Sequence, residues 1–399
     1  MGRGKEKSEK NGAGVTVSSS KGLAEEVRSV ILKEGLFDPA RSIGRDEEVH
    51  FPVLLPEGRD MEWLMGLFGR TSAELTFEEG PGGTRKMARR ETPFQQAREM
   101  LASGLSEREI ALLPNRWEML GDCLVLKVDP LLLPSLERIA EVYMGLLHAR
   151  YSILDQTGVH GELRLPSTRV IVPPPDGDHE VVHRENGIVY RLDPRDLMFS
   201  SGNIEERTTV RSIIDNGPKT PRERRTIEDG GTFKGEMVLD MFAGIGYFTL
   251  PMASSPNVER VVAVEKNPRA FHYLCRNMFE NKVEGKVVPV LGDNRASVPA
   301  HCFDRIMMGY VGSTSNFLRN AFDYIRPEGA MVHFHDKVGI EKGAAGSFKE
   351  MVKEHCPEGL EVELISSRKV KSYAPRVDHI CLDLLVQPRG RQGIWACKP

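Results

Sequence analysis

One short stretch of the chain combines the residue types that a strand-to-helix turn needs in order to hold a polar ligand. The stretch DMFAGIGYF places Asp240 before two glycines, Gly244 and Gly246, with aromatic residues on either side. Because glycine lacks a Cβ, the backbone at these positions can turn sharply and let a ligand approach closely. The helix expected to start near Tyr247 offers backbone N–H groups that have no partner within the helix. A polar ligand is therefore expected at this turn.

Acidic residues follow the next two strand-like stretches, and their types indicate which ligand the turn holds. Glu265 ends the stretch VVAVE, where a carboxylate can accept two hydrogen bonds from a ribose diol. Asp293 and Asn294 in LGDN can address the exocyclic amine and a ring nitrogen of adenine. The dinucleotide fingerprint requires a third glycine or alanine where this chain has Thr249, so NAD is disfavoured. With no phosphate-binding basic residue among these positions, the pattern favours S-adenosylmethionine.

The residues after Gly235 alternate between strand-like and helix-like stretches, and this order predicts how the side chains come together. Such alternation predicts an α/β, Rossmann-like fold with a mostly parallel sheet covered by helices on both faces. Ligands bind such sheets at the carboxyl ends of the strands. The last two strand-like stretches, 361–370 and 379–387, have no helix-length spacer, so an antiparallel pair is expected. Upstream, the alternation around Asn186-Gly187 predicts a tight hairpin.

Composition along the chain predicts five segments. Residues 1–20 are rich in Lys, Gly and Ser and are expected to form a disordered tail, followed by a small α+β module over 21–80. A middle α+β module over 81–215 is expected to bind RNA and to flank the cofactor. Residues 216–235 contain no apolar run and are predicted to be a linker or mobile loop, and residues 236–399 form the catalytic domain.

The overall composition limits the compartment and the partners. A formal net charge of −3 argues against a uniformly basic surface, so any RNA contact must be local. The six cysteines lack CxxC spacing, which fits free thiols in a reducing compartment. Because no stretch has the character of a signal peptide or a membrane span, we expect a cytoplasmic monomer without membrane contact. His333 and His335 lack an evident third ligand, so a core position is expected and no metal site.

Several motifs in this order resemble the tRNA wybutosine-synthesizing protein 2 family, relatives of the tRNA guanine-N1 methyltransferases that act next to the anticodon. The motifs are FSSGNIEER, DMFAGIGYFTLP, EKNP, GDN and MGYV, and the resemblance runs from about Leu112 to the segment VKSYAPRVDHICLDL. It implies transfer of the 3-amino-3-carboxypropyl group of S-adenosylmethionine to a carbon of 4-demethylwyosine in tRNA(Phe). Methylthioadenosine would be released.

The resemblance also assigns residues to the cofactor. The family's contacts fall on the FSSGNIEER segment and on the acidic residues after the second and third strands, and Arg207 is the residue that could clasp a carboxylate through its planar guanidinium. Together with the turn, the candidate cofactor-binding residues are Ser200, Arg207, Phe242, Gly244, Gly246, Glu265, Asp293, Asn294 and Gly309.

One departure separates this chain from the guanine-N1 methyltransferases. Those relatives carry an Asn-Leu-Pro type motif after the fourth strand, whereas this chain has MGYVGST at 308–314. An asparagine that would orient guanine for methylation is thus missing, and methyl transfer is disfavoured. A guanine-N1 methyltransferase and a non-catalytic tRNA-binding scaffold remain the alternative functions.

Three residues are candidates near the reacting centre by motif position: Glu206, Asp240 and Tyr310. Each has a structural alternative. Glu206 can instead pair with a neighbouring basic residue, Asp240 can hold the loop amides, and Tyr310 can be part of the packing. A transfer of this kind depends mainly on alignment of the reacting atoms, so the proton acceptor is not identified at this stage.

Local basic runs are the candidates for RNA contact, although such runs are also common on solvated surfaces. The linker arginines form one further basic run of this type. An aromatic residue beside lysines in KSYAP can stack on an extruded base. The RNA-binding candidates are Arg85, Lys86, Arg89, Arg90, Lys369, Lys371 and Tyr373.

Overall fold

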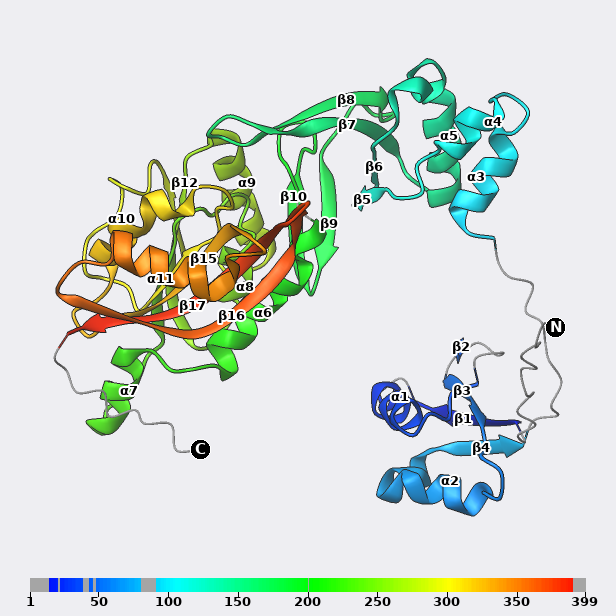
Figure 1. Ribbon diagram of the computed structural model, residues 1–399, viewed down its shortest axis with the longest axis horizontal. Coiled ribbons are helices and arrows are strands. Elements are labelled where there is room, and N and C mark those ends of the chain that lie inside the picture. The colour runs from blue at the N-terminus through cyan, green and yellow to red at the C-terminus, as the bar shows by residue number, and fades with distance from the viewer. Residues whose placement is uncertain are drawn as a thin grey trace, which may run out of the picture. The chain divides into compact units, whose positions relative to one another are not determined.

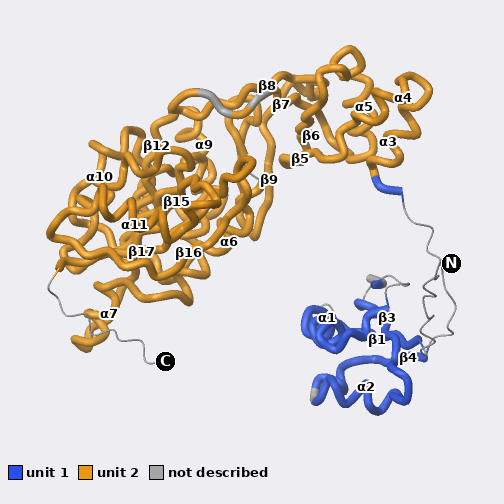
Figure 2. Tube along the Cα trace, in the orientation of Figure 1, with its two compact units in different colours: residues 1–92 blue, residues 93–399 orange. Residues whose placement is uncertain are grey.

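The computed structural model describes residues 14–20, 22–38, 43–45, 48–79, 91–199 and 201–389. The chain divides into two compact units, residues 1–92 and 93–399, shown in different colours in Figure 2. The predicted division instead separated a middle module from the catalytic domain. Five predicted site residues lie outside the described residues, namely Ser200, Arg85, Lys86, Arg89 and Arg90.

The first unit is a small antiparallel sheet with two helices. Its elements are β1 (Gly14–Ser19), α1 (Ala24–Lys33), β2 (Gly44–Arg45), β3 (Val49–Leu54), α2 (Met61–Leu67), η1 (Gly69–Glu74) and β4 (Thr76–Glu79), with strand order β2-β3-β1-β4. The prediction of a disordered tail is wrong for Gly14–Ser19, because β1 pairs on both sides and buries Val15 and Val17 completely. The strand was missed because the prediction was based on the high overall polarity of residues 1–20, although Val15 and Val17 alternate with polar residues.

The second unit begins with a small module, residues 93–172. Its elements are α3 (Pro93–Leu101), α4 (Glu107–Ala111), β5 (Glu118–Leu120), β6 (Cys123–Leu126), η2 (Pro130–Ser135), α5 (Leu136–Leu147), β7 (Tyr151–His160) and β8 (Leu165–Val172), with strand order β5-β6-β7-β8. Leu101 of α3 and Ile139 and Tyr143 of α5 are fully buried in one core. The module is therefore built around these packed helices.

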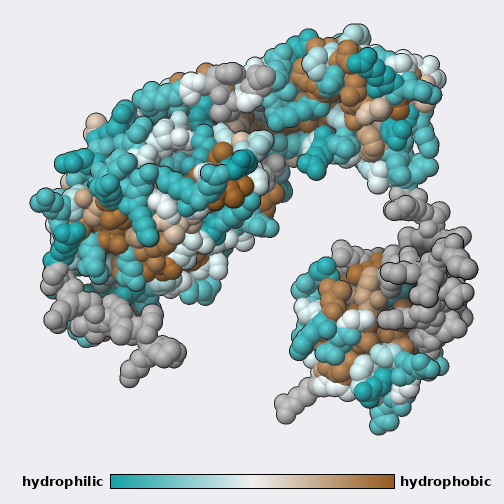
Figure 3. All heavy atoms as spheres, viewed as in Figure 1, coloured by the Kyte–Doolittle hydropathy of each residue, from teal (hydrophilic) through white to brown (hydrophobic). Residues whose placement is uncertain are grey.

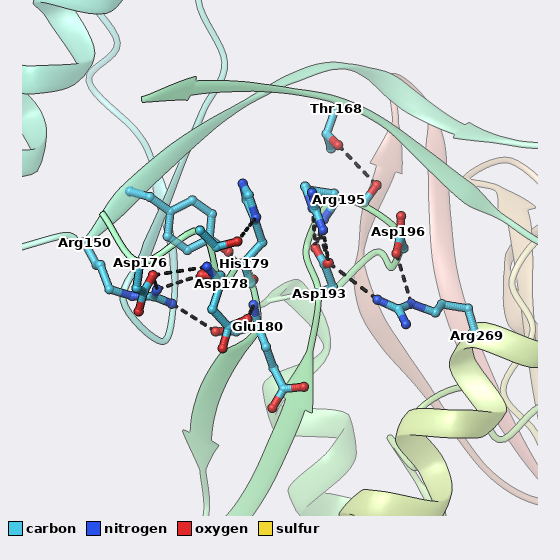
Figure 4. Close-up of polar contacts among 12 residues, drawn as sticks. Arg150, Thr168, Asp176, Asp178, His179, Glu180, Asp193, Arg195, Asp196 and Arg269 are labelled. Carbon is cyan, nitrogen blue, oxygen red and sulfur yellow. Dashed lines mark hydrogen bonds and ion pairs between the residues drawn. The ribbon is translucent and has the colours of Figure 1, made fainter. Parts of the chain in front are cut away.

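A hairpin and a cluster of ion pairs connect the small module to the remainder of the unit. The predicted tight turn is confirmed, because Asn186 and Gly187 have φ angles of 50° and 78° between β9 (Val181–Glu185) and β10 (Ile188–Leu192). Arg150 donates to Asp122 at 2.7 Å. It also donates to Asp176 at 2.8 Å (Figure 4). The bond to Asp176 attaches the loop before β9 to the segment that follows α5, and the bond to Asp122 attaches that segment to the turn between β5 and β6.

A second part of this cluster reaches the large sheet's helices. Asp193 accepts three bonds from the Arg195 guanidinium, and Arg269 lies 3.6 Å from Asp193 and donates to Asp196 at 3.0 Å (Figure 4). Because Arg269 belongs to a helix of the large sheet, these contacts fix the segment after the hairpin against that sheet.

A seven-stranded sheet forms the remainder of the unit and confirms the predicted Rossmann-like α/β fold (Figure 1). Its strand order is β13-β12-β11-β14-β15-β17-β16, in which the first five strands pair in parallel and β17 pairs antiparallel with both β15 and β16. The strands are β11 (Glu236–Asp240), β12 (Val258–Glu265), β13 (Val287–Leu291), β14 (Arg305–Met308), β15 (Ala330–Gly339), β16 (Leu360–Ala374) and β17 (Val377–Pro388).

Helices cover both faces of this sheet because successive residues of each strand point to opposite sides. Val238 of β11 is in one core with residues of α6, α8 and α9, whereas Leu239 is in the other with residues of α10 and α11. The helical elements are η3 (Ser201–Asn203), α6 (Ile204–Asn216), α7 (Pro221–Glu228), α8 (Thr249–Ala253), α9 (Pro268–Glu280), η4 (Thr314–Phe317), α10 (Leu318–Tyr324) and α11 (Gly343–His355).

The predicted linker at 216–235 contains the helix α7. Thr220 caps the helix by accepting a hydrogen bond from the backbone N–H of Glu223. Arg222 then donates to both carboxylate oxygens of the buried Asp304, at 2.7 and 2.8 Å. The prediction of a loop is wrong here because a cap and an ion pair, rather than an apolar face, hold this segment.

The surface and the helices give two further facts. Hydrophilic residues predominate on the face of the second unit seen in Figure 3, with smaller hydrophobic patches between them. Within the part of the chain that the structure describes, every helix is too short or too polar to cross a membrane.

A buried ion pair lies at the amino end of the central strands. Arg305 on β14 donates to both oxygens of Glu236 on β11, at 2.5 and 2.8 Å, and its third nitrogen lies 2.7 Å from His333 Nε2. Arg305 and Glu236 are at most 1% exposed. Together with His333 of β15, the pair therefore joins three neighbouring strands in the buried interior.

Replacing Arg305 by methionine is expected to lower the free energy of unfolding by about 3–5 kcal/mol, because Glu236 would remain buried without its partner. The matched control is Arg211→Met, since Arg211 forms a half-exposed pair with Asp215 and such pairs contribute about 1 kcal/mol at most. Urea titration of both full-length variants measures the difference. Equal unfolding midpoints would contradict the expectation.

Candidate active site

A cavity of about 900 Å³ lies where β11, β12, β13 and β14 end, and residues of the small module and of α6 complete its walls. Seven of the nine predicted cofactor-binding residues line it: Arg207, Phe242, Gly244, Glu265, Asp293, Asn294 and Gly309. Gly246 does not line the cavity, and Ser200 lies outside the described residues. The parallel strands thus bring together side chains that are far apart in sequence.

The two glycines of the turn have different roles. Gly244 and Gly246 have φ angles of 57° and 103°, a region that side-chain-bearing residues rarely adopt. A Cβ on Gly246 would lie 2.7 Å from the side chain of Leu250, within the turn's own packing. The prediction that Gly246 contacts the cofactor is therefore not supported by its position, whereas Gly244 lines the cavity.

Glu265 fixes the turn to the neighbouring strand. Its Oε2 accepts a hydrogen bond from Gly244 N–H at 2.7 Å, and its Oε1 accepts one from Asn267 N–H, also at 2.7 Å. Burial raises the pKa of Glu265 above its usual value. Each carboxylate oxygen keeps a second lone pair, so Glu265 can accept two hydroxyl donors from the cavity.

Asn294 and Asp293 lie side by side in sequence but differ in their partners. Asn294 donates through Nδ2 to the carbonyl of Met241 at 2.7 Å, while its buried Oδ1 accepts no hydrogen bond from any residue that the structure describes. Asp293 accepts from Arg295 at 2.8 and 2.5 Å, and this guanidinium holds the pKa of Asp293 well below its usual value. Asn294 Oδ1 is thus an acceptor that a ligand N–H group can satisfy.

Asp240 lies beneath the turn rather than in the cavity. It is fully buried, and its oxygens accept from Phe242 N–H at 3.2 Å and from the Thr249 hydroxyl at 2.7 Å. Burial raises the pKa of Asp240 to about 6. This geometry matches the alternative in which Asp240 holds the loop, and not a direct role at the reacting centre.

Two adjacent residues of α6, Glu206 and Arg207, already form ion pairs with other side chains. Arg207 lines the cavity, but its guanidinium donates two bonds of 2.6 Å to Glu185 of β9. Glu206 does not line the cavity, and it accepts from Arg368 of β16. Arg207 was expected to bind the carboxylate of the cofactor, but in this structure it binds the carboxylate of Glu185. Glu206 pairs with a basic residue, which is the structural alternative given for it above.

An aromatic wall closes one side of the cavity. Tyr310 is stacked on Phe242 with ring centroids 5.2 Å apart, and Phe317 meets Phe242 edge-on at 5.0 Å. The Arg164 guanidinium lies 5.3 Å from the Tyr310 ring centroid. Sequence reasoning missed Arg164, since it is a lone arginine between two strands, in no basic run.

The predicted RNA-binding residues of β16 separate around a bulge between Lys369 and Lys371. Lys371 lines the cavity, where burial together with two nearby arginines lowers its pKa. Lys369 pairs with Asp378 at 2.8 Å outside the cavity. Tyr373 is 44% exposed at the cavity's edge, with Lys337 Nζ 4.4 Å from its ring centroid.

The two histidines of HFHDK belong to a buried polar network. His333 pairs with Asp383 at 2.6 Å. His335 lies with Glu206 and Cys381 in a group whose ligand atoms are all within 4.8 Å of one another. The Arg368 guanidinium pairs with Glu206 and lies 3.2 Å from Cys381 Sγ, so a cation already neutralises this group. The set therefore fits an arginine and not a metal ion.

Comparison with known proteins agrees with this geometry. The model of the TRM5/TYW2 methyltransferase domain matches residues 217–365, and that of the TYW2 N-terminal domain matches residues 97–176. The tRNA(Phe) (4-demethylwyosine(37)-C(7)) aminocarboxypropyltransferase of Pyrococcus horikoshii is 37% identical over 292 residues, which are 72% of this chain and 95% of that protein. The tRNA (guanine(37)-N(1))-methyltransferase Trm5b of Pyrococcus abyssi is 30% identical over 278 residues, 69% of this chain and 76% of that protein.

A solved structure supports the same assignment. The crystal structure of P. horikoshii TYW2 in complex with MeSAdo superposes with a TM-score of 0.61 at 34% identity, and the match covers 74% of this chain and 99% of that one. The matched domains include the five parallel strands of the large sheet and most of the small module. The chain therefore belongs to the tRNA wybutosine-synthesizing protein 2 family, within the wider TRM5/TYW2 group.

Proposed function

We propose that this chain transfers the 3-amino-3-carboxypropyl group of S-adenosylmethionine to a carbon of 4-demethylwyosine in tRNA(Phe), with release of methylthioadenosine. The observation that carries the proposal is one cavity in which Glu265 offers carboxylate lone pairs and Asn294 a buried acceptor that no described residue satisfies. The P. horikoshii relative is named for this transfer at 37% identity. A cytoplasmic location and a monomeric state remain part of the proposal.

The cofactor's nucleoside end is assigned to the carboxyl edge of β11 to β13. Glu265 would accept the ribose hydroxyls, because its position is fixed by two backbone N–H groups. Asn294 Oδ1 would accept the exocyclic amine of adenine. Phe242 and Gly309 line the same region, and a Cβ on Gly309 would lie 2.7 Å from the Phe248 ring. These contacts bind a nucleoside without using a positive charge.

The methionine arm is assigned to the cationic part of the cavity. Because the Arg207 guanidinium is paired with Glu185, we assign the carboxylate of the arm to Lys371, with Arg164 nearby on the same cavity wall. An arm held there can present its γ-carbon to the base. The nucleophilic ring carbon then forms a bond to that γ-carbon as the C–S bond breaks, and the electron pair stays on sulfur.

The tRNA is assigned to the edge of this cavity. Tyr373 is exposed there, with Lys337 over its ring, and can stack on a base. Lys369 lies on the same strand outside the cavity and can meet a phosphate. Tyr310 would contact the extruded base from the aromatic wall.

Isotope labelling separates the three possible functions. Incubation of the full chain with tRNA(Phe) carrying 4-demethylwyosine is expected to move label from the carboxyl group of S-adenosylmethionine into the RNA. Label from the methyl group should stay in the released nucleoside. Methyl label in the RNA would indicate a guanine-N1 methyltransferase, and no transfer of either label would indicate a scaffold.

Glu265→Gln is expected to weaken binding of methylthioadenosine by about 1.5–3 kcal/mol, because an amide cannot accept from both Gly244 and Asn267 and also from a ribose. The control Glu259→Gln changes an exposed carboxylate on the same strand. Calorimetry of both variants gives the two dissociation constants. Unchanged affinity in Glu265→Gln would remove Glu265 from the site.

Lys371→Met is expected to weaken binding of S-adenosylmethionine by roughly tenfold, because the carboxylate loses a charged partner. Binding of methylthioadenosine, which has no carboxylate, should be unchanged. Lys369→Met serves as the matched control, since Lys369 lies two residues away on the same strand and outside the cavity. Equal losses for both ligands would show that Lys371 shapes the cavity and does not bind the carboxylate.

A further inference from the structure

Two histidines form a hydrogen-bonded imidazole pair at the wall of the cavity. His335 Nδ1 of β15 lies 3.0 Å from His379 Nε2 of β17, and both residues are fully buried. His379 lines the cavity, whereas His335 lies behind it. The remaining ring nitrogen of His379, Nδ1, is buried and has no hydrogen-bond partner among the described residues.

The charged residue behind the pair determines which nitrogens carry protons. His335 Nε2 has no hydrogen-bond partner among the described residues, but it faces Glu206 Oε1 at 3.6 Å, and Arg368 holds this carboxylate in place. A carboxylate favours the tautomer with its proton on the facing nitrogen, so His335 carries hydrogen on Nε2. His335 Nδ1 is then an acceptor, and His379 must donate to it from Nε2. His379 Nδ1 therefore keeps a lone pair that no described residue satisfies, buried in a side chain that lines the cavity.

We propose that His379 Nδ1 accepts the ring proton that the nucleobase loses in the transfer reaction, with His335 and Glu206 as positioning residues. This inference rests on the proposed function. After the new carbon–carbon bond has formed, the C–H bond at the same ring carbon breaks, and its electron pair restores the aromatic ring. The proton binds Nδ1, and the resulting positive charge is stabilised by Glu206 through His335. Water takes the proton after the product leaves.

The electrostatic surroundings suit a base that is neutral before the reaction. Lys371 of β16 and Arg164 face His379 from the cavity side, while His335 and Glu206 face it from behind. Burial and the neighbouring His335 and Lys371 lower the pKa of His379 to about 3, and burial lowers that of His335 to about 3. The pair is thus unprotonated near neutral pH. The alkylated ring cation is strongly acidic, so a weak base is sufficient.

The other predicted candidates are less suited to this step. Asp240 is bonded to the turn, and Glu206 does not line the cavity. Tyr310 does line it, but a tyrosine hydroxyl is a weaker proton acceptor than a neutral imidazole. Glu206 thus acts through the histidine pair, which explains how a carboxylate behind the wall can influence the reacting base.

Single-turnover transfer of carboxyl-labelled substrate tests the inference, using tRNA with hydrogen or deuterium at the reacting ring carbon. His379→Gln keeps a polar group near His335, and His379→Asn keeps one near the cavity, but neither amide can take a proton. Both variants are expected to lower the rate by about a hundredfold or more, the lower end of the general-base range. They should also show a larger deuterium isotope effect than the parent chain, while binding methylthioadenosine normally.

The control is His272→Gln, which changes an exposed histidine of α9 and should behave as the parent chain. Parent-like rates and isotope effects in both His379 variants would show that water takes the proton, and would overturn the inference. Loss of methylthioadenosine binding together with an unchanged isotope effect would assign His379 a structural role and would also overturn it. Absence of carboxyl transfer in the parent chain would instead overturn the proposed function.

Discussion

The carboxylate of Glu265 is the interaction on which the cavity depends. It accepts one backbone N–H from Gly244, after the first strand of the sheet, and another from Asn267, after the second strand. Two loops that would otherwise be independent are thereby fixed to one side chain. The same oxygens face the cavity, so the group that organises the site also offers the lone pairs that a sugar needs. The loop geometry and the ligand contacts cannot be changed separately.

Much of the catalytic domain could be predicted because its signals are local. Alternation of strands and helices indicated the sheet, and the missing spacer before residue 379 indicated the antiparallel end. Glu265 and Asn294 line the cavity as expected because parallel strands place their carboxyl ends at one edge. Their positions follow from strand order alone, without knowledge of any long-range contact.

The remaining features depend on contacts that sequence reasoning could not see. Gly246 was expected at the ligand because a missing Cβ lets a ligand approach, but here the missing Cβ allows close packing against Leu250. Arg207 was expected to be available, and only the fold brings Glu185 of the hairpin within 2.6 Å of it. Residues 216–235 were predicted to be a linker or loop because they contain no apolar run. The ion pair from Arg222 to the distant Asp304, which holds this segment, leaves no periodic pattern in the sequence. In each case a partner far away in the chain decides the outcome.

The position of Arg164 between β7 and β8 has a consequence for how such an enzyme can diversify. One wall of the cavity comes from the small module, and the floor comes from the carboxyl edge of the large sheet. The two are encoded in separate stretches of the chain. Insertions or exchanges in the β7–β8 connection can therefore reshape the entrance for a different nucleobase while the nucleoside pocket stays intact, so substrate range and donor chemistry can evolve independently.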